Sequence, residues 1–179
     1  MPKTPSTTSP VTPPPAAVAQ DAHWAAKLAR LRARTRPTTT LTICDDDAVR
    51  EALEAAKRRV DHAQVLGDDT EQQTAADDLA TAQATFDDAA IVLTFQALPR
   101  PDFDALKLAH PPTESQAEDG QIVNVETLGP ELIAAASTDG LTPDDARAFL
   151  TEWAAGEAAQ LFLAVWDLQT DVRSDLGKG

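Results

Sequence analysis

The chain has 179 residues, of which 42% are hydrophobic but only 4% aromatic, and its formal net charge is −14. This length suits one ordinary domain, or a small domain with an appendage, and argues against two full domains. The single cysteine, Cys44, excludes an internal disulfide and any metal site built from several cysteines.

The charge is distributed unevenly along the chain. Residues 1–40 carry six basic side chains and one acidic side chain, a net charge of +5, which leaves −19 for residues 41–179. A body this acidic repels phosphates, so we expect no nucleic-acid partner. The first 20 residues lack the apolar core of a signal peptide, and no run of about 18 apolar residues occurs. We therefore expect a soluble, cytosolic protein with no membrane partner.

The N-terminal part is expected to be a disordered tail followed by a basic helix. Residues 1–20 are rich in Pro and Thr and cannot bury enough apolar surface to fold. Within residues 21–37, Trp24, Leu28 and Leu31 recur at helical spacing between basic side chains, which predicts a basic amphipathic arm. The arm either docks on an acidic partner or lies on the chain's own acidic body. Trp24 and Leu28 are candidate partner-binding residues.

Residues 38–98 predict a unit of two strands with two helices between them. The runs TTTLTI, residues 38–43, and IVLTFQ, residues 91–96, have the composition and alternation of strands. The intervening helices each carry an apolar seam with heptad spacing, formed by Val49, Leu53, Ala56, Val60 and Ala63, and by Ala75, Leu79, Ala82, Phe86 and Ala89. Gly67 ends the first helix and Asp68 begins the second. The pattern predicts a two-stranded antiparallel sheet with an inserted antiparallel helical hairpin.

The chain after the second strand shows signals of further short helices. Pro101 suits the first turn of a helix that ends at His110 and the two prolines after it. Residues 113–122 are polar and predict a loop. A further helix is expected over about residues 125–136, where a Gly-Pro pair either splits the helix or marks its start.

The last part of the chain has the clearest helix start. Thr142 suits an N-cap and Pro143 the first helical position, with two acidic residues after them. Gly156 is expected to break or bend this helix before a last one begins. Residues 99–171 are thus predicted to form a bundle of short helices, and residues 172–179 a flexible tail. The predicted fold class is α+β, predominantly α.

Motifs for catalysis or cofactor binding are missing from the sequence. His23, His62 and His110 lie in three different predicted elements, and the acidic run at residues 45–47 lacks the spacing and turn glycine of a calcium loop. No phosphate-binding glycine loop, nucleophile elbow or His-Glu-x-x-His motif occurs. We therefore expect no enzyme, no catalytic residue, no metal and no cofactor, and we interpret the acidic run as a helix cap.

The C-terminal part concentrates the chain's few aromatic residues. Trp153, Phe162 and Trp166 fall within fourteen positions of one another. Two interpretations stay open: the aromatic residues form the core, or part of the cluster docks a partner, since Trp is enriched at interface hot spots. Together with Glu157, these three residues are candidate partner-binding residues.

The order of these pieces resembles a known family. The segments are LTFQALPRPDFDALKLAHPPTE, VNVETLGPELIAAAS and LTPDDARAFLTEWAAGEAAQLFLAVWDLQ. The residues that carry the resemblance are Phe95, Ala97, Leu98, Phe103, Leu106, His110, Pro111, Pro112, Asn124, Leu132, Ile133, Trp153, Glu157, Leu161 and Phe162. Over roughly residues 38–170 the chain resembles tail assembly chaperones of long-tailed, siphovirus-type phages that infect actinobacteria. It departs from their pattern at Ala154, where a polar residue is expected, and at Val123, where an aromatic residue is expected.

The resemblance implies a non-enzymatic protein of the host cell cytoplasm that binds the tape-measure protein and recruits major tail-tube subunits. It also implies a longer form made by ribosomal frameshifting, for which codons of Gly177-Lys178-Gly179 could supply the slippery sequence. Formation of a homo-oligomer stays open. The alternative is a virion structural protein, such as a head-tail connector or minor tail component. A third hypothesis is a small regulatory or toxin-neutralising protein that uses the basic arm.

Overall fold

The computed structural model describes residues 15–174, and the chain divides into two compact units. The first unit ends at Thr35 and the second begins at Arg36. Residues 1–14 and 175–179, for which the sequence predicted a disordered tail and a flexible end, lie outside the described residues. No helix in the described part is both long enough and apolar enough to cross a membrane.

The described part of the first unit is mainly one helix, α1, which spans Pro15–Arg32. This helix begins inside the segment predicted to be disordered, so the predicted start is too late. Proline is favoured in the first turn of a helix, and the alanines that follow Pro15 favour the helical state. Trp24 and Leu31 are exposed and Leu28 is half-buried. The apolar side chains of the predicted arm are therefore largely open to solvent.

The second unit is organised around a two-stranded antiparallel sheet, as predicted. Strand β1, Thr38–Ile43, pairs along its whole length with β2, Ile91–Gln96. Thr38 lies opposite Gln96 and Ile43 opposite Ile91. Because side chains alternate between the faces of a strand, one face of this sheet is apolar and the other is rich in threonine.

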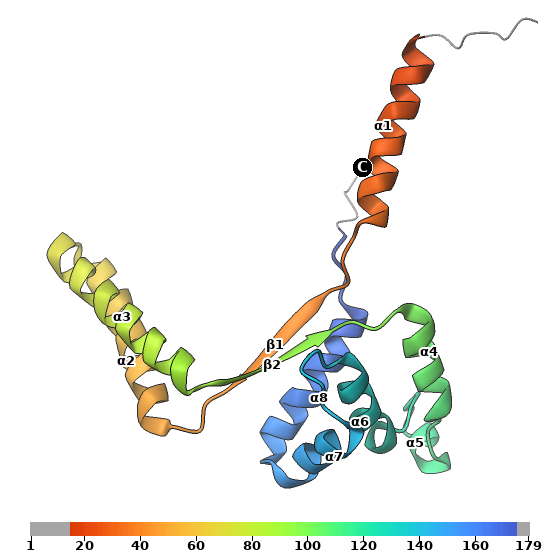
Figure 1. The fold of residues 1–179 in the computed structure, drawn as a ribbon. Helices are drawn as coiled ribbons and strands as arrows, with labels where there is room; N and C mark the ends of the chain where they lie inside the picture. The colour runs from red at the N-terminus through yellow and green to blue at the C-terminus, as the bar shows by residue number, and fades with distance from the viewer. Residues whose placement is uncertain (1–14, 175–179) are drawn as a thin grey trace, which may run out of the picture. The chain divides into compact units, whose positions relative to one another are not determined.

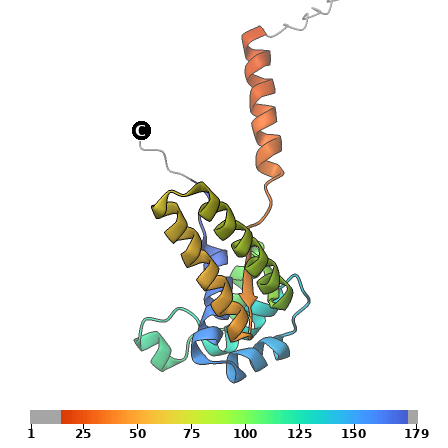
Figure 2. The same cartoon turned by 90° about the vertical axis from the view of Figure 1, so that its left-hand side faces the viewer.

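The helices α2, Asp47–Leu66, and α3, Asp69–Ala89, form the predicted antiparallel hairpin between the two strands (Figure 1). The predicted seams pack against each other, and Leu53, Ala56 and Ala63 of α2 and Ala75 of α3 are buried between the helices. Gly67 ends α2 with a φ of 75°, a left-handed conformation that favours glycine. Asp46 and Asp68 cap the two helices by accepting backbone N–H groups. Figure 2 shows the two helices side by side.

Five helices follow β2 in the described part of the chain. They are α4 (Arg100–Ala109), α5 (Glu114–Glu118), α6 (Val125–Ala136), α7 (Pro143–Glu152) and α8 (Ala155–Thr170). Two of them, α6 and α8, pack against the strands of the sheet. The core lies between this face and helices α6, α7 and α8. Its largest fully buried side chains are Phe95, Leu128, Leu132, Ile133, Leu161 and Val165. The predicted fold class, mostly helical α+β, is confirmed.

Two details of the C-terminal part differ from the sequence prediction. The segment predicted as a polar loop contains α5, because Thr113 and Gln116 form a reciprocal capping box that satisfies two backbone N–H groups. The Gly-Pro pair does not split α6 or mark its start, since the helix runs through Pro130. Gly129 is close to Leu150 and Phe162 of the neighbouring helices, where a Cβ atom would lie 3.3 Å from Leu150 Cδ1.

The break between α7 and α8 also differs from the prediction. The sequence placed it at Gly156, but α7 ends at Glu152 and α8 begins at Ala155, so Gly156 lies inside α8. Trp153 has an extended backbone and stacks on Phe149 of the preceding turn, with ring centroids 4.7 Å apart. Ala154 provides no side-chain cap.

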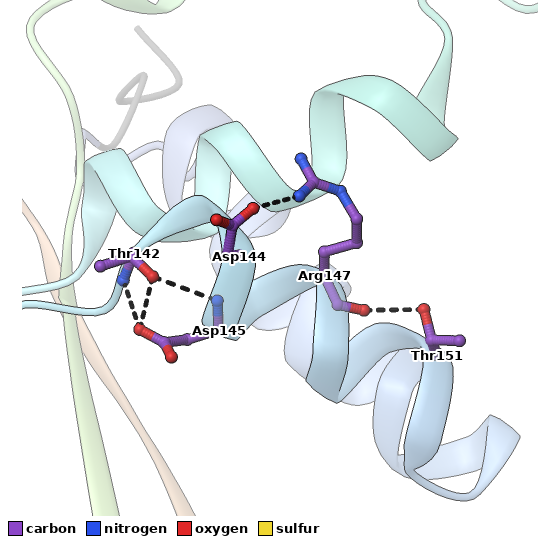
Figure 3. Close-up of polar contacts among 5 residues, drawn as sticks. All are labelled: Thr142, Asp144, Asp145, Arg147 and Thr151. Carbon is purple, nitrogen blue, oxygen red and sulfur yellow. Dashed lines mark hydrogen bonds and ion pairs between the residues drawn. The ribbon is translucent and has the colours of Figure 1, made fainter.

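The start of α7 is capped as predicted (Figure 3). Thr142 Oγ1 accepts the backbone N–H of Asp145 at 3.1 Å. The Asp145 carboxylate in turn accepts the backbone N–H and the hydroxyl of Thr142, at 3.0 and 2.6 Å. These bonds, the hydroxyl bond foremost, lower the pKa of Asp145. The contribution of the Asp145 charge to stability is therefore present above the ordinary aspartate pKa and is lost as the pH falls through the lowered value.

Replacing the cap residue, Thr142→Ala, is expected to lower the free energy of unfolding by about 1 kcal/mol, because the first turn of α7 loses a hydrogen-bond acceptor. Urea unfolding followed by circular dichroism measures the change. Thr151→Ala is the matched control. The Thr151 hydroxyl donates a hydrogen bond to the Arg147 carbonyl of the same helix and does not cap the helix start (Figure 3). Equal losses in the two variants would contradict the capping role.

Candidate partner-binding site

A cavity of about 490 Å³ lies where the sheet, the base of the hairpin and the α7–α8 junction meet. Its wall is mainly apolar, and the seven apolar side chains of the wall come from β1, α3, β2, α7 and the turn between α7 and α8. They are Leu41, Ile43, Phe86, Ile91, Leu93, Phe149 and Trp153. We call this feature the junction cavity. A pocket with an apolar wall and a few polar groups is the usual form of a binding site.

Strand alternation brings four of these side chains together. Leu41 and Ile43 of β1 lie directly opposite Leu93 and Ile91 of β2, on the same face of the sheet. This face is covered by α8 near Leu41, but its far end reaches beyond the helical core. Ile91 is consequently 60% exposed although it lies on the apolar face. Within the described part of the chain, no helix or strand of its own covers this apolar end of the sheet.

The remaining apolar wall comes from aromatic residues on both sides of the sheet end. Phe86 lies in the last turns of α3, where the hairpin returns to the sheet. Phe149 and Trp153 stack with an interplanar angle of 16° at the end of α7. Both are half-buried and pack partly against the core. The cavity thus lies between a hairpin aromatic residue and an aromatic pair fixed by the core.

Charged and polar groups surround the apolar wall. The lining includes Arg50 at the start of α2 and Glu157 in the first turn of α8. Arg50 forms an ion pair with Asp47, and this hydrogen bond is the largest cause of the raised pKa of Arg50, with a smaller contribution from Glu157. Thr42, Asp45 and Gln160 complete the polar part. The rim offers both signs of charge and has more carboxylates than cations.

The structure places only two of the six predicted partner-binding residues in the junction cavity. Trp153 and Glu157 line it. Phe162 and Trp166 instead stack on each other at 5.8 Å, and Trp166 also meets Phe103 of α4 edge-on at 5.7 Å. This second aromatic group packs α4 against the core.

The other two predicted residues, Trp24 and Leu28, belong to α1 in the first unit. A role in partner binding stays a prediction for all six. Sequence reasoning missed Phe86 and Ile91 as lining residues. The available signal was an apolar strand start directly after an apolar helix seam, which places two large side chains at the hairpin base.

The described residues contain no group of three or more His, Cys, Asp or Glu side chains suited to a metal ion.

His110, which follows α4, lies at the helix end that the sequence predicted for it. Its Nδ1 lies 3.0 Å from the Thr127 hydroxyl, and its carbonyl accepts the Asn124 N–H at 2.9 Å. His110 therefore joins α4 to the start of α6. The junction cavity is suited to bind apolar side chains rather than a charged ligand.

Five of the fifteen residues that carry the family resemblance are buried, and most of the others are half-buried. Phe95, Leu132, Ile133 and Leu161 are fully buried, and Ala97 is buried beside them. They determine how the sheet packs on α6 and α8. No protein-family model, curated protein or solved structure matches the chain.

Proposed function

We propose that the protein is a non-enzymatic phage tail assembly chaperone, which binds the tape-measure protein in the host cytoplasm and recruits major tail-tube subunits. The observation that carries the proposal is the junction cavity, an apolar site that is open at Ile91 and surrounded by an acidic body. The order of the sequence pieces that resemble such chaperones supports the choice of partner.

The expected mechanism is shielding of apolar helical stretches of the tape-measure protein. Large apolar side chains of such a stretch would enter the junction cavity and cover Ile91 and Trp153. Each 100 Å² of apolar surface removed from water contributes roughly 2.5 kcal/mol before the costs of association. The charge of −19 on residues 41–179 opposes aggregation of the complex through repulsion between copies.

Co-expression of the chain with the tape-measure protein of the same phage tests the proposal. The expected result is a larger soluble fraction of tape-measure protein, which co-purifies with the chain. An unchanged soluble fraction would contradict the proposal. Mass spectrometry of purified virions separates the chaperone from the alternative, a virion structural protein, because the chaperone is expected to be absent and a connector present at fixed copy number.

A further inference from the structure

Two carboxylates at the rim of the junction cavity are left without an ion pair in the described part of the chain. They belong to Asp45 and Glu157, which both line the cavity. Arg50 lines it too, but its hydrogen bond with Asp47 is the largest cause of its raised pKa, whereas Glu157 is a minor one. The charge that the rim offers to a partner is therefore negative.

The two carboxylates come from different parts of the fold. Asp45 lies in the connection between β1 and α2, and Glu157 lies in the first turn of α8, where the helix dipole favours a negative charge. Both residues are exposed. Because both line the same cavity, an apolar side chain that enters it brings the neighbouring residues of its own segment close to both carboxylates.

We propose that the segment which enters the junction cavity is a basic amphipathic helix, with Lys or Arg one turn before and one turn after its large apolar residue. The inference rests on the proposed function and specifies which stretches of the tape-measure protein the chain binds. Residues three or four positions apart share one face of a helix, so the basic side chains reach the rim while the apolar residue enters the cavity. Their apolar stems also cover Ile91 and Trp153.

Segments of other composition fit this rim less well. A segment without charges would partly desolvate Asp45 and Glu157 and give them no partner in return. An acidic segment would add repulsion between like charges. Helix α3 of a second copy is disfavoured for the same reason, since it carries several acidic residues and no Lys or Arg.

Two labelled helical peptides test the charge preference with the full chain. Both are alanine- and glutamine-based, about 18 residues long so that they form helices, and carry two leucines one turn apart at the centre. The Lys peptide has Lys one turn before and one turn after the leucines, and the Glu peptide has Glu there. Fluorescence anisotropy at about 0.1 M salt gives both dissociation constants. We expect the Lys peptide to bind about tenfold more tightly.

Glu157→Lys separates the effect of the rim from that of the acidic chain as a whole. The variant is expected to bind the Lys peptide about fivefold more weakly and the Glu peptide more tightly. Glu126→Lys is the matched control, because Glu126 is an exposed residue in the first turn of α6 and does not line the junction cavity. It is expected to leave both dissociation constants within about twofold, since salt screens distant charges.

The outcomes separate this inference from the proposed function. Equal binding of the two peptides, or equal losses in Glu157→Lys and Glu126→Lys, would overturn the charge preference. Binding of neither peptide would overturn the basic helix as the occupant. The proposed function is read separately, from the soluble fraction of tape-measure protein in co-expression. A dimer of the chain alone that the Lys peptide dissociates would identify the basic helix α1 of a second copy as the occupant, and would overturn the choice of the tape-measure protein.

Discussion

Ile91→Asp is expected to reduce the soluble tape-measure protein in co-expression to the level found without the chain. The substitution places a charge in the open part of the junction cavity, where an apolar partner side chain would have to desolvate it. Because Ile91 is 60% exposed, the fold should tolerate the change. The soluble fraction and the amount that co-purifies measure the effect.

Val92→Asp is the matched control for this result. Val92 is the next residue of β2, is 50% exposed and receives the same charge, but it lies on the opposite face and does not line the junction cavity. It is expected to retain nearly the full soluble fraction of tape-measure protein. Equal losses in both variants would show that acidity, not the cavity, governs binding. An unaffected Ile91→Asp variant would remove the cavity from the proposal.

Leu161→Ala is expected to lower the free energy of unfolding by about 2–5 kcal/mol, because a fully buried side chain is truncated and leaves a cavity. Leu161 lies in α8 and belongs to the core that joins the sheet to α6 and α8. The whole free energy of unfolding of a domain is only about 5–15 kcal/mol, so this loss is a large share of it. A large fraction of the Leu161→Ala molecules is therefore expected to be unfolded near physiological temperature. Urea unfolding followed by circular dichroism gives the change.

Leu163→Ala provides the comparison on the same helix. Leu163 lies two residues further along α8 and is 49% exposed, so the same truncation is expected to change the free energy of unfolding by no more than about 0.5 kcal/mol. The two variants have identical chemistry and differ in burial. A similar loss for both would mean that α8 does not face the core as described.

The strands and the helical hairpin were predictable because their signals are local. The spacing of apolar residues changes from two in residues 38–43 to three and four in the helices, and back to two in residues 91–96. Gly67 and the aspartate after it mark the turn between the helices. These signals also determine the antiparallel pairing, since a hairpin that goes out and returns leaves its two strands side by side.

Elements whose limits depend on packing were predicted less well. Helix α7 ends at Glu152, where Trp153 leaves the helix and stacks on Phe149, while Gly156, the local breaker signal, lies inside α8. Similarly, Pro130 lies inside α6 although proline usually ends or bends a helix. Helix α5 lies in a segment whose polarity predicts a loop, and only its capping pair, Thr113 and Gln116, indicates a helix.

The candidate site was predictable only in part. Trp153 and Glu157 stand out in the sequence and line the junction cavity. Phe86 and Ile91 also line the cavity because α3 returns to the sheet there, which the sequence indicates only through an apolar strand start directly after an apolar helix seam. The sequence also did not indicate which of Trp153 and Trp166 lines the cavity. The two tryptophans belong to different aromatic groups, one at the cavity and one beneath α4.

Photo-cross-linking from inside the junction cavity tests the central claim most directly. A photoreactive residue would replace Gln160, an exposed lining residue of α8, in cells that also make the tape-measure protein. A second variant would carry it at Gln73, on the exposed surface of α3. We predict a cross-link from position 160 to an apolar helical stretch of the tape-measure protein and none from position 73. No cross-link from position 160, in a variant that still keeps the tape-measure protein soluble, would contradict the claim that the cavity is the binding site.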